Sequence, residues 1–532
     1  MTDMNHLAIL PILVPMIAAI ANLLLSDQRS DKRVVGLNIG FSALLLLVSI
    51  LLLVALAQSG QTAAAVYPLG NWPIPFGIVL VADRLAAIMV LTTSVLALAA
   101  LIYASARWHN RAPNFFPLFH ALTMGLNGAF LTGDLFNLFV FFELLLAASY
   151  GLALFGGGRN RVRSAIHYIV INLVASFLFL IGVALIYGTT GTLNMADIAR
   201  AVPHIAADDR GLFEAGAAVL GIAFLIKAGS WPLHFWLPNT YSAAAPPVAA
   251  LFAVMTKVGF YAILRLWMLV FANLSGPEAT FGQTTLLVLG VATVAYGSIG
   301  ALSSKALDRL ASYLILVSAG TLLLAVGYNS PGVTAGALYY FVVATLAAGA
   351  LFLLKDIIDQ ILPAEAQVLA VSMELYGDEE EILDEDQEVS RTIPAAATLI
   401  SLCFAIAALV MAGLPPLSGF IAKFAMISSA LNADNAPNVA TWWITGALIV
   451  SGLFVLVSMV RNGINIFWTS LPEDGVLRLR PLEIGPIVVL LALCVVLAIA
   501  AGPAMGFFAE TAAFIHDPQA YIQIVLPAES AL

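Results

Sequence analysis

Charged residues are scarce in this chain, because Asp, Glu, Lys and Arg make up only 10% of its 532 residues. A soluble globular domain carries about a quarter, so the composition excludes a water-soluble fold. Hydrophobic residues account for 61% of the chain, and apolar runs of about 20 residues, each enough to cross a bilayer core, recur along its length. The weak alternating segments of a membrane β-barrel are also missing. The sequence therefore predicts an all-α polytopic membrane protein.

Cysteine is almost absent too, with only Cys403 and Cys494 in the whole chain. Both lie within apolar runs and lack the spacing of a metal or redox site, so we interpret them as small hydrophobic residues. The sequence has no Walker motif, no haem or metal ligand set, and no catalytic triad. We therefore expect no cofactor and no enzymatic active site.

Acidic residues outnumber basic ones, and the formal net charge is −9. Much of this charge lies in one segment, ELYGDEEEILDEDQE, at residues 374–388. A run of like charges is typical of a solvated segment without a packed core. We therefore expect an acidic loop over 364–392, outside the membrane.

Hydropathy and loop residues predict fourteen membrane spans. The spans lie near residues 5–26, 34–57, 79–103, 114–131, 134–155, 164–187, 211–229, 247–271, 283–302, 309–327, 333–358, 393–413, 440–462 and 484–508. Loops after odd-numbered spans hold 14 Lys and Arg residues, whereas loops after even-numbered spans hold three. Because positive residues gather on the cytoplasmic side, we predict cytoplasmic odd-numbered loops, including the acidic loop, and both termini outside.

Proline interrupts the apolar pattern twice, in GSWPLHFWLP after span 7 and in GLPPLSGF after span 12. The two breaks lie five spans apart, and an odd offset is typical of inverted-topology repeats. We therefore predict two inverted five-helix repeats, formed by spans 4–8 and 9–13, with spans 7 and 12 broken. The chain then divides into flanking spans 1–3 at 1–110, a first repeat at 111–272, a second repeat with the acidic loop at 273–462, and a C-terminal flanking helix at 463–532.

Three lysines lie deep inside apolar sequence: Lys227, Lys257 and Lys423. A charge at the bilayer centre costs roughly 2.5–3.5 kcal/mol even on the scale from insertion experiments, so each of them needs a reason. Arg265 and Lys355 lie nearer to span ends, where a long side chain can place its charge at the membrane interface.

Glu143 is an acidic residue in the middle of an apolar span, about nine residues from either end of span 5, which places it near the midplane. One interpretation is a static ion pair between Glu143 and Lys227. Buried ion pairs seldom stabilise more than apolar packing does, so the other interpretation is a lysine that takes up and releases a proton as its partner moves. Lysine suits this task and arginine does not, because arginine stays charged. Glu143 and the three lysines would then form a proton path.

Four other polar residues are weaker candidates. His234, in the first break, is either a hydrogen-bonded core residue or a relay. His120 and His167 lie nearer the ends of spans 4 and 6, where we expect an interfacial role. Asp134, at the outer end of span 5, is expected to cap the helix.

Five stretches of the sequence resemble a known family, the D-type components of Mrp/Pha multisubunit monovalent cation/proton antiporters. More distantly, they resemble the antiporter-like membrane subunits of respiratory complex I. The stretches are LGNWPIPFGIVLVADRLAAIM (69–89), GLNGAFLTGDLFNLFVFFELLLAASYGL (125–152), FLIKAGSWPLHFWLP (224–238), APPVAALFAVMTKVGFYAILRL (245–266) and AGLPPLSGFIAKF (412–424). The resemblance implies fourteen spans with two inverted five-helix repeats, in a hetero-oligomer with subunits A, B, C, E, F and G of a bacterial cytoplasmic (inner) membrane.

The same resemblance assigns roles to the buried charges. Glu143 matches the family's essential glutamate, Lys227 and Lys257 its paired central lysines, and Lys423 its lysine on broken span 12.

Span 11 departs from the family pattern. Relatives often carry a histidine or lysine there, where this chain has Val343 and Ala348. Two replacements are open: water and hydroxyl groups such as that of Thr345 make the link, or Lys355, seven residues further on the same helical face, substitutes.

The sequence therefore favours a secondary transporter, in which proton entry through this chain drives export of Na⁺ or K⁺ by the complex. A proton-pumping component of a redox assembly related to complex I or to hydrogenases is the alternative, and a stand-alone permease or scaffold is a third. The buried lysines do not separate the first two, because both share this membrane chemistry.

Overall fold

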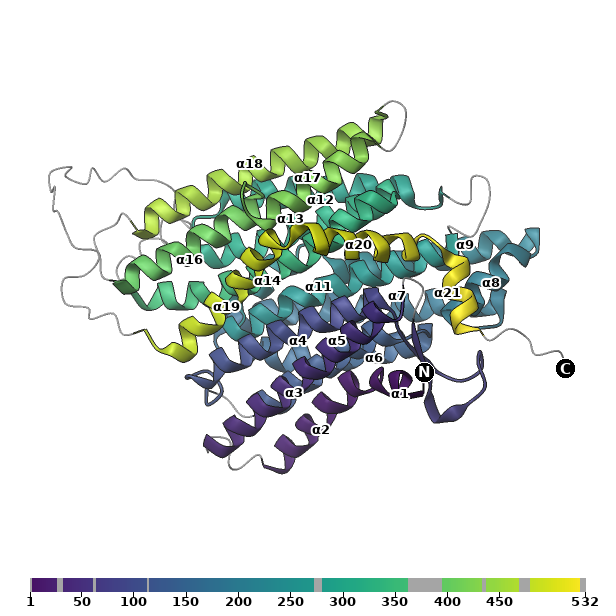
Figure 1. Ribbon diagram of the computed structural model, residues 1–532, viewed down its shortest axis with the longest axis horizontal. Coiled ribbons are helices and arrows are strands. Elements are labelled where there is room, and N and C mark those ends of the chain that lie inside the picture. The colour runs from purple at the N-terminus through teal and green to yellow at the C-terminus, as the bar shows by residue number, and fades with distance from the viewer. Residues whose placement is uncertain are drawn as a thin grey trace.

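A computed structural model of the protein describes residues 2–25, 32–60, 64–111, 114–271, 280–361, 395–432, 437–467 and 479–526. The axes of most of its helices lie roughly parallel to one another and form one bundle (Figure 1). The helices are α1 (Thr2–Leu7), α2 (Leu10–Leu24), α3 (Lys32–Gln58), α4 (Arg84–Ser105), α5 (Phe115–Leu131), α6 (Leu135–Ala153), α7 (Arg159–Thr190), α8 (Met195–Ala201), α9 (Ala207–Ala228), α10 (Leu237–Ala243), α11 (Pro246–Leu266), α12 (Gln283–Ser303), α13 (Leu307–Tyr328), α14 (Pro331–Ile361), α16 (Ala395–Ala412), α17 (Ser418–Leu431), α18 (Val439–Phe467), α19 (Pro481–Ile499), α20 (Ala501–Ile515) and α21 (Pro518–Val525), and the strands are β1 (Ala65–Pro68) and β2 (Val79–Ala82).

The all-α polytopic fold is confirmed. Within the described ranges, 12 helices are long and apolar enough to cross a membrane, and three shorter apolar helices cover α5, most of α16 and α17. The count of fourteen spans and the inverted relation of the two repeats stay predictions.

Three helices form the interior of the bundle. The apolar window of α11 is 100% buried and those of α13 and α14 are 94% buried, whereas those of α3, α18 and α19 are only 33% buried. In Figure 1, α11 and α14 accordingly lie in the middle, with α2 and α3 along one edge and α18 along the other. A polar side chain in the apolar middle of α11, α13 or α14 is therefore surrounded mostly by protein.

The predicted third span, 79–103, is wrong at its start. Residues Val79–Ala82 form β2, which pairs with β1 in an antiparallel hairpin. The helix begins only at Arg84, because Asp83 is its N-cap and accepts a hydrogen bond from Ala86 N. The apolar side chains of β2 extended the hydropathy signal beyond the helix.

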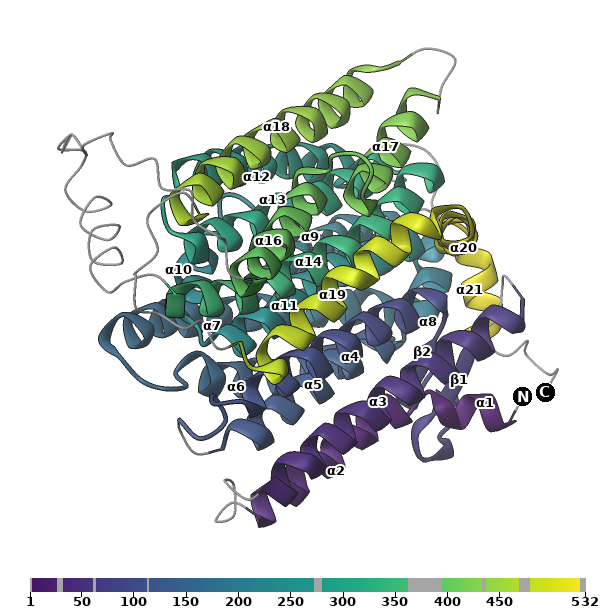
Figure 2. The ribbon, with the colours of Figure 1, turned by 60° about the vertical axis from the view of Figure 1, so that its left-hand side comes forward.

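The predicted last span, 484–508, is wrong as one continuous helix. The chain turns at Ala500 between α19 and α20, and Figure 2 looks along α20 while it shows α19 from the side. Pro503 has no backbone N–H to donate to the carbonyl group of Ile499, so α19 cannot continue with regular hydrogen bonds.

Both predicted breaks are confirmed. After α9, Gly229 takes the left-handed conformation with φ +71°, and Ser230 N donates to Leu225 O at 2.9 Å. Residues 229–236 then form turns before α10 and α11. After α16, residues 413–417 are non-helical before α17 begins.

The first and last helices, α1 and α21, lie at the same end of the bundle in both views (Figures 1 and 2). Which side of the membrane this end faces stays a prediction, as does the division into four segments. The predicted acidic loop over 364–392 lies outside the described residues.

Candidate functional site

Glu143 and Lys227 come close without touching. Glu143, on α6, accepts a hydrogen bond from the Ser176 hydroxyl group of α7. The ammonium group of Lys227 lies 5.6 Å from the centroid of the Phe142 ring, next to Glu143 in sequence. Lys227 is only 5% exposed, and within the described part of the chain its Nζ atom has no hydrogen-bond partner. The static ion pair considered from the sequence is therefore absent between these two described residues.

The position of Lys227 follows from the break behind it. It lies in the last turn of α9, where free carbonyl groups and the negative end of the helix dipole favour a cation. Ala228 is the last residue of α9, because the next residue, Gly229, takes the left-handed conformation and ends the helix. A Cβ atom at Gly229 would also lie 2.7 Å from Leu237 Cδ1, so the break is closely packed.

Lys257, on α11, points away from α9. A Cβ atom at Gly259 would lie 2.6 Å from Ala228 N, so α11 packs on the end of α9 with the face that contains Gly259. Two residues correspond to about 200° on a helix, so Lys257 projects from the opposite face. There its Nζ atom donates a hydrogen bond of 2.7 Å to Ser318 Oγ of α13. Lys257 is 1% exposed.

The hydroxyl group of Thr256, the residue before Lys257, is also buried in α11. Thr256 precedes Gly259 by three residues and shares the face towards α9. It is fully buried, and its Oγ1 atom has no hydrogen-bond partner within the described ranges. A free hydroxyl group in this place can accept and donate a proton.

Lys423, on α17, binds the other side of the second break. Its Nζ atom donates a hydrogen bond of 3.0 Å to Ala412 O, the last residue of α16. The ammonium group thus meets the negative end of the α16 dipole. A Cβ atom at Gly413 would lie 2.6 Å from Lys423 Cδ, so the lysine stem lies directly on the backbone of the break.

We expect Gly413→Ala to reduce transport strongly. The φ of Gly413 is +77°, a conformation that costs an L-residue about 1–2 kcal/mol, and the new methyl group would displace the Lys423 side chain. Gly446→Ala is the matched control, since nothing lies within 4 Å of its Cβ position. Ion flux in membrane vesicles checks both variants, and equal activity of the two would contradict this account of the break.

His234 is not hydrogen-bonded in the described structure. Its ring is 5% exposed and stacks at a tilt on Tyr296, with the ring centroids 4.0 Å apart. Both ring nitrogens lack partners among the described residues. The interpretation as a hydrogen-bonded core histidine is therefore wrong, and its role as a relay stays a prediction.

The two replacements considered for span 11 have defined positions. The Thr345 hydroxyl group donates a hydrogen bond of 2.6 Å to Phe341 O of its own helix. The Nζ atom of Lys355 lies 2.5 Å from a carboxylate oxygen of Asp359 and 3.8 Å from one of Asp308. Lys355 thus belongs to an ion-pair cluster that joins the start of α13 to the last turns of α14.

Two polar residues near span ends are buried within the protein, and their position relative to the membrane interface stays a prediction. Arg265 is 6% exposed, and its guanidinium group donates hydrogen bonds to both carboxylate oxygens of Asp83 at 2.6 and 2.7 Å. His120 is 2% exposed, and its Nε2 atom lies 2.8 Å from Asn38 Oδ1. Each polar group found a buried partner, and the two partners are 182 and 82 residues away along the chain.

The expectation for Asp134 is confirmed. Its side chain caps α6 by accepting a hydrogen bond of 2.8 Å from Asn137 N. His167 is exposed near the start of α7, and its interfacial role stays a prediction.

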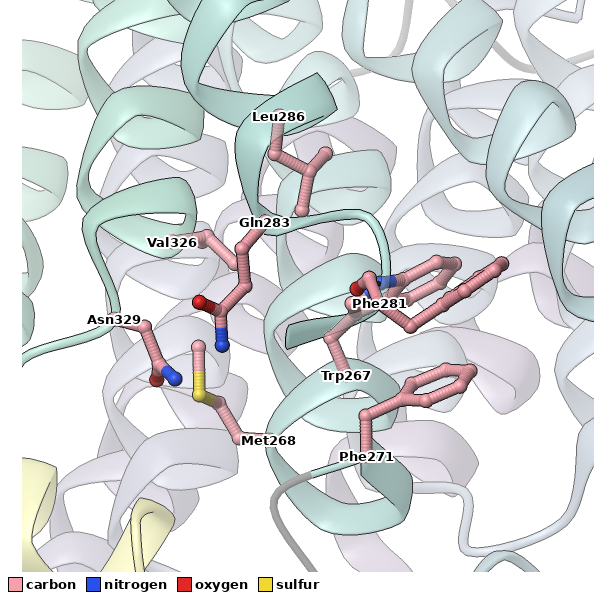
Figure 3. A pocket seen from close by; sticks show the side chains of 8 residues that line it. All are labelled: Trp267, Met268, Phe271, Phe281, Gln283, Leu286, Val326 and Asn329. Atoms are coloured by element: carbon pink, nitrogen blue, oxygen red, sulfur yellow. Dashed lines mark hydrogen bonds between the residues drawn. The ribbon is translucent and has the colours of Figure 1, made fainter. Parts of the chain in front are cut away.

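A small cavity lies apart from these charges, where the ends of α11 and α13 meet the start of α12 (Figure 3). Its lining residues are Trp267, Met268, Phe271, Phe281, Gln283, Leu286, Val326 and Asn329. Neither Glu143 nor any of the three buried lysines is among them, so this cavity is not part of the candidate site.

The sequence did not predict the two serines that hold Glu143 and Lys257. Ser176 and Ser318 are small hydroxyl residues in apolar spans, where many serines only bond to their own helix. No pattern in one sequence distinguishes them.

The fold and the site together define a class: a multi-pass helical membrane protein with lysines buried beside two broken helices. Residues 132–449 match the family model described as NADH:quinone oxidoreductase/Mrp antiporter, transmembrane region. The chain therefore belongs to this family.

Individual relatives agree with this assignment. The chain is 51% identical to the D component of a probable K⁺/H⁺ antiporter of Rhizobium meliloti (strain 1021). The alignment covers 100% of this chain and 99% of that relative. It is 38% identical over 98% of its length and 100% of the relative's to the D component of the Na⁺/H⁺ antiporter of Alkalihalophilus pseudofirmus. A chain of the Mrp complex from Dietzia sp. DQ12-45-1b has a similar fold, with a TM-score of 0.81 at 27% identity over 99% of this chain and 100% of that one.

Proposed function

We propose that this chain is the proton-translocating D-type component of a multisubunit monovalent cation/proton antiporter. It exchanges external H⁺ for cytoplasmic Na⁺ or K⁺ through Glu143, Lys227, Lys257 and Lys423. It is part of a secondary transporter rather than an enzyme, and it works in a bacterial cytoplasmic membrane with subunits of types A, B, C, E, F and G. We also propose the orientation with both termini outside.

One observation carries this proposal. Within the described residues, the ammonium groups of the three buried lysines contact an aromatic ring, a hydroxyl group and a carbonyl group, and none makes an ion pair with a carboxylate. A buried ammonium without a counter-charge is costly, and losing its proton removes that cost. Such lysines are suited to releasing and binding protons, which a structural role does not require.

Glu143 supplies the movable charge in this scheme. An ionised Glu143 favours a protonated Lys227, and protonation of Glu143 removes that support. Lys227 then releases its proton towards α11, where Thr256 and Lys257 follow. Lys423, at the second break, serves the half of the bundle that contains α16 to α18.

The alternative is a proton-pumping component of a redox assembly, because the matching family model includes NADH:quinone oxidoreductases. Purification of the intact complex from membranes separates the two. Co-purifying small membrane subunits and proton flux that depends on added Na⁺ or K⁺ support the antiporter. Co-purifying flavin or iron–sulfur proteins, with no effect of added cation, would overturn it.

We expect Lys355→Ala to keep most of the transport activity. The ion pairs of Lys355 with Asp359 and Asp308 lie at the start of α13 and the end of α14. Part-exposed ion pairs of this kind contribute little to the stability of the fold. Cation-dependent flux in vesicles checks this. A loss as complete as that of a Lys257 variant would instead assign Lys355 to the proton path, as the second replacement for the missing span-11 group requires.

A further inference from the structure

The first break is hydrogen-bonded to a helix from the other half of the chain. Trp231 N, within the break, donates a hydrogen bond of 2.9 Å to Thr293 Oγ1 of α12, and Ser230 Oγ lies 3.3 Å from the same oxygen. Thr293 is 1% exposed, and Ser230 is fully buried. The break belongs to the predicted first repeat (111–272) and α12 to the second (273–462), so this contact joins the two halves of the chain.

The hydroxyl group of Thr293 is oriented to accept from the break. It donates its own proton to Leu289 O of α12 at 2.6 Å, so its lone pairs remain for Trp231 N. Thr93, on α4, is a useful contrast. It is also fully buried and donates to Met89 O of its own helix at 2.8 Å, but within the described residues it makes no further hydrogen bond. The contact with the break is therefore what distinguishes Thr293 from an ordinary buried threonine.

The same break closes the end of α9, where Lys227 lies. Ser230 N donates to Leu225 O at 2.9 Å, and Trp236 Nε1 donates to Ile226 O at 3.3 Å. The two carbonyl groups belong to the residues directly before Lys227. A change in the shape of the break would therefore alter which carbonyl groups are free at this helix end, and such groups favour a nearby cation.

We propose that Thr293 is a positioning residue for Lys227. By accepting the hydrogen bond from Trp231 N, it holds the break in the shape that keeps Lys227 at the end of α9, where it exchanges its proton. Thr293 acts through the backbone of the break and does not itself carry the proton. Because Thr293 belongs to α12, a movement in the second half of the chain reaches Lys227 through this bond. This inference rests on the proposed function.

Thr293→Val tests the role, because it keeps the size and branching of the side chain and removes the acceptor. In vesicles that contain the complete complex, cation-dependent proton flux is expected to fall about tenfold, the order expected for one lost buried hydrogen bond. The pH at which flux is half-maximal is also expected to shift, because the surroundings of Lys227 change. Thr93→Val is the matched control and should transport like the wild type, since it loses only a bond to its own helix. Equal flux and equal pH profiles of the two variants would overturn the inference.

Thr293→Ser and Thr293→Cys separate the hydrogen bond from packing, and they remain informative if the valine variant does not assemble. Both lack the methyl group, but serine keeps the oxygen atom whereas the cysteine sulfur accepts only weakly. Per assembled complex, the serine variant should keep the wild-type flux and pH profile, and the cysteine variant should show reduced flux and a shifted profile. The same behaviour of both variants would mean that the hydrogen bond is not needed, and would overturn the inference.

Lys227→Ala, measured in parallel, separates the two levels of the argument. If Lys227→Ala is inactive while Thr293→Val transports normally, the positioning role fails and the proposed function stands. If Lys227→Ala transports like the wild type, the proposed function fails and the role of Thr293 fails with it.

Discussion

Glu143→Gln is expected to abolish cation-dependent proton flux while the complex stays assembled. The substitution keeps the size and shape of the side chain, and the Gln amide can still accept the hydrogen bond from Ser176. It removes the charge that supports protonation of Lys227. The variant therefore tests titration rather than packing, and the expected loss is complete. Dye-monitored flux in everted membrane vesicles, with the amount of complex measured in the same membranes, checks this.

Glu214→Gln is a suitable control for the assay. Glu214 is only partly buried near the start of α9, three helical turns or more before Lys227, and we assign it no role. It should transport like the wild type. Wild-type flux in Glu143→Gln would remove Glu143 from the path and leave Lys227 without a movable partner.

Lys227→Arg is expected to be as inactive as Lys227→Ala, although arginine keeps the charge. Arginine does not release its proton in the physiological range, so it can stabilise Glu143 but cannot pass a proton to α11. Its larger planar head would also have to fit beside Phe142, where Lys227 now lies. Flux measurements over a range of pH values check this for both variants.

An active Lys227→Arg variant would have a clear meaning. Lys227 would then be a fixed positive charge that helps Glu143 to ionise, and the proton would have to bypass α9. An inactive Lys227→Ala with an active Lys227→Arg is therefore the pattern that contradicts the relay.

The sequence predicted the burial of the three central lysines well, although it did not predict that of Arg265 and His120. Lys227, Lys257 and Lys423 interrupt long apolar runs, and each is buried in the protein. A charged side chain in the middle of a span faces the bundle interior because contact with lipid is costly. The two breaks were equally clear, since a glycine followed two or three residues later by proline disfavours a continuous helix. The predicted span boundaries were wrong in two places. A neighbouring strand, β2, was as apolar as the helix after it, and a single proline, Pro503, follows the turn that divides a long hydrophobic run.

Partners could not be predicted, because they come from distant parts of the chain. Asp83 caps α4, and nothing in the sequence indicates that it also binds Arg265. The hydroxyl group of Ser318 is equally inconspicuous, because only the packing of α13 against α11 gives it Lys257 as a neighbour.

The most direct test of the central claim is the simultaneous recording of proton and cation flux by the purified complete complex in liposomes. An imposed pH gradient should drive Na⁺ or K⁺ against its own gradient with the wild-type chain, and should drive none with Glu143→Gln in an equally assembled complex. Coupled transport at the wild-type rate with Glu143→Gln would contradict a proton path through the buried glutamate and lysines of this chain.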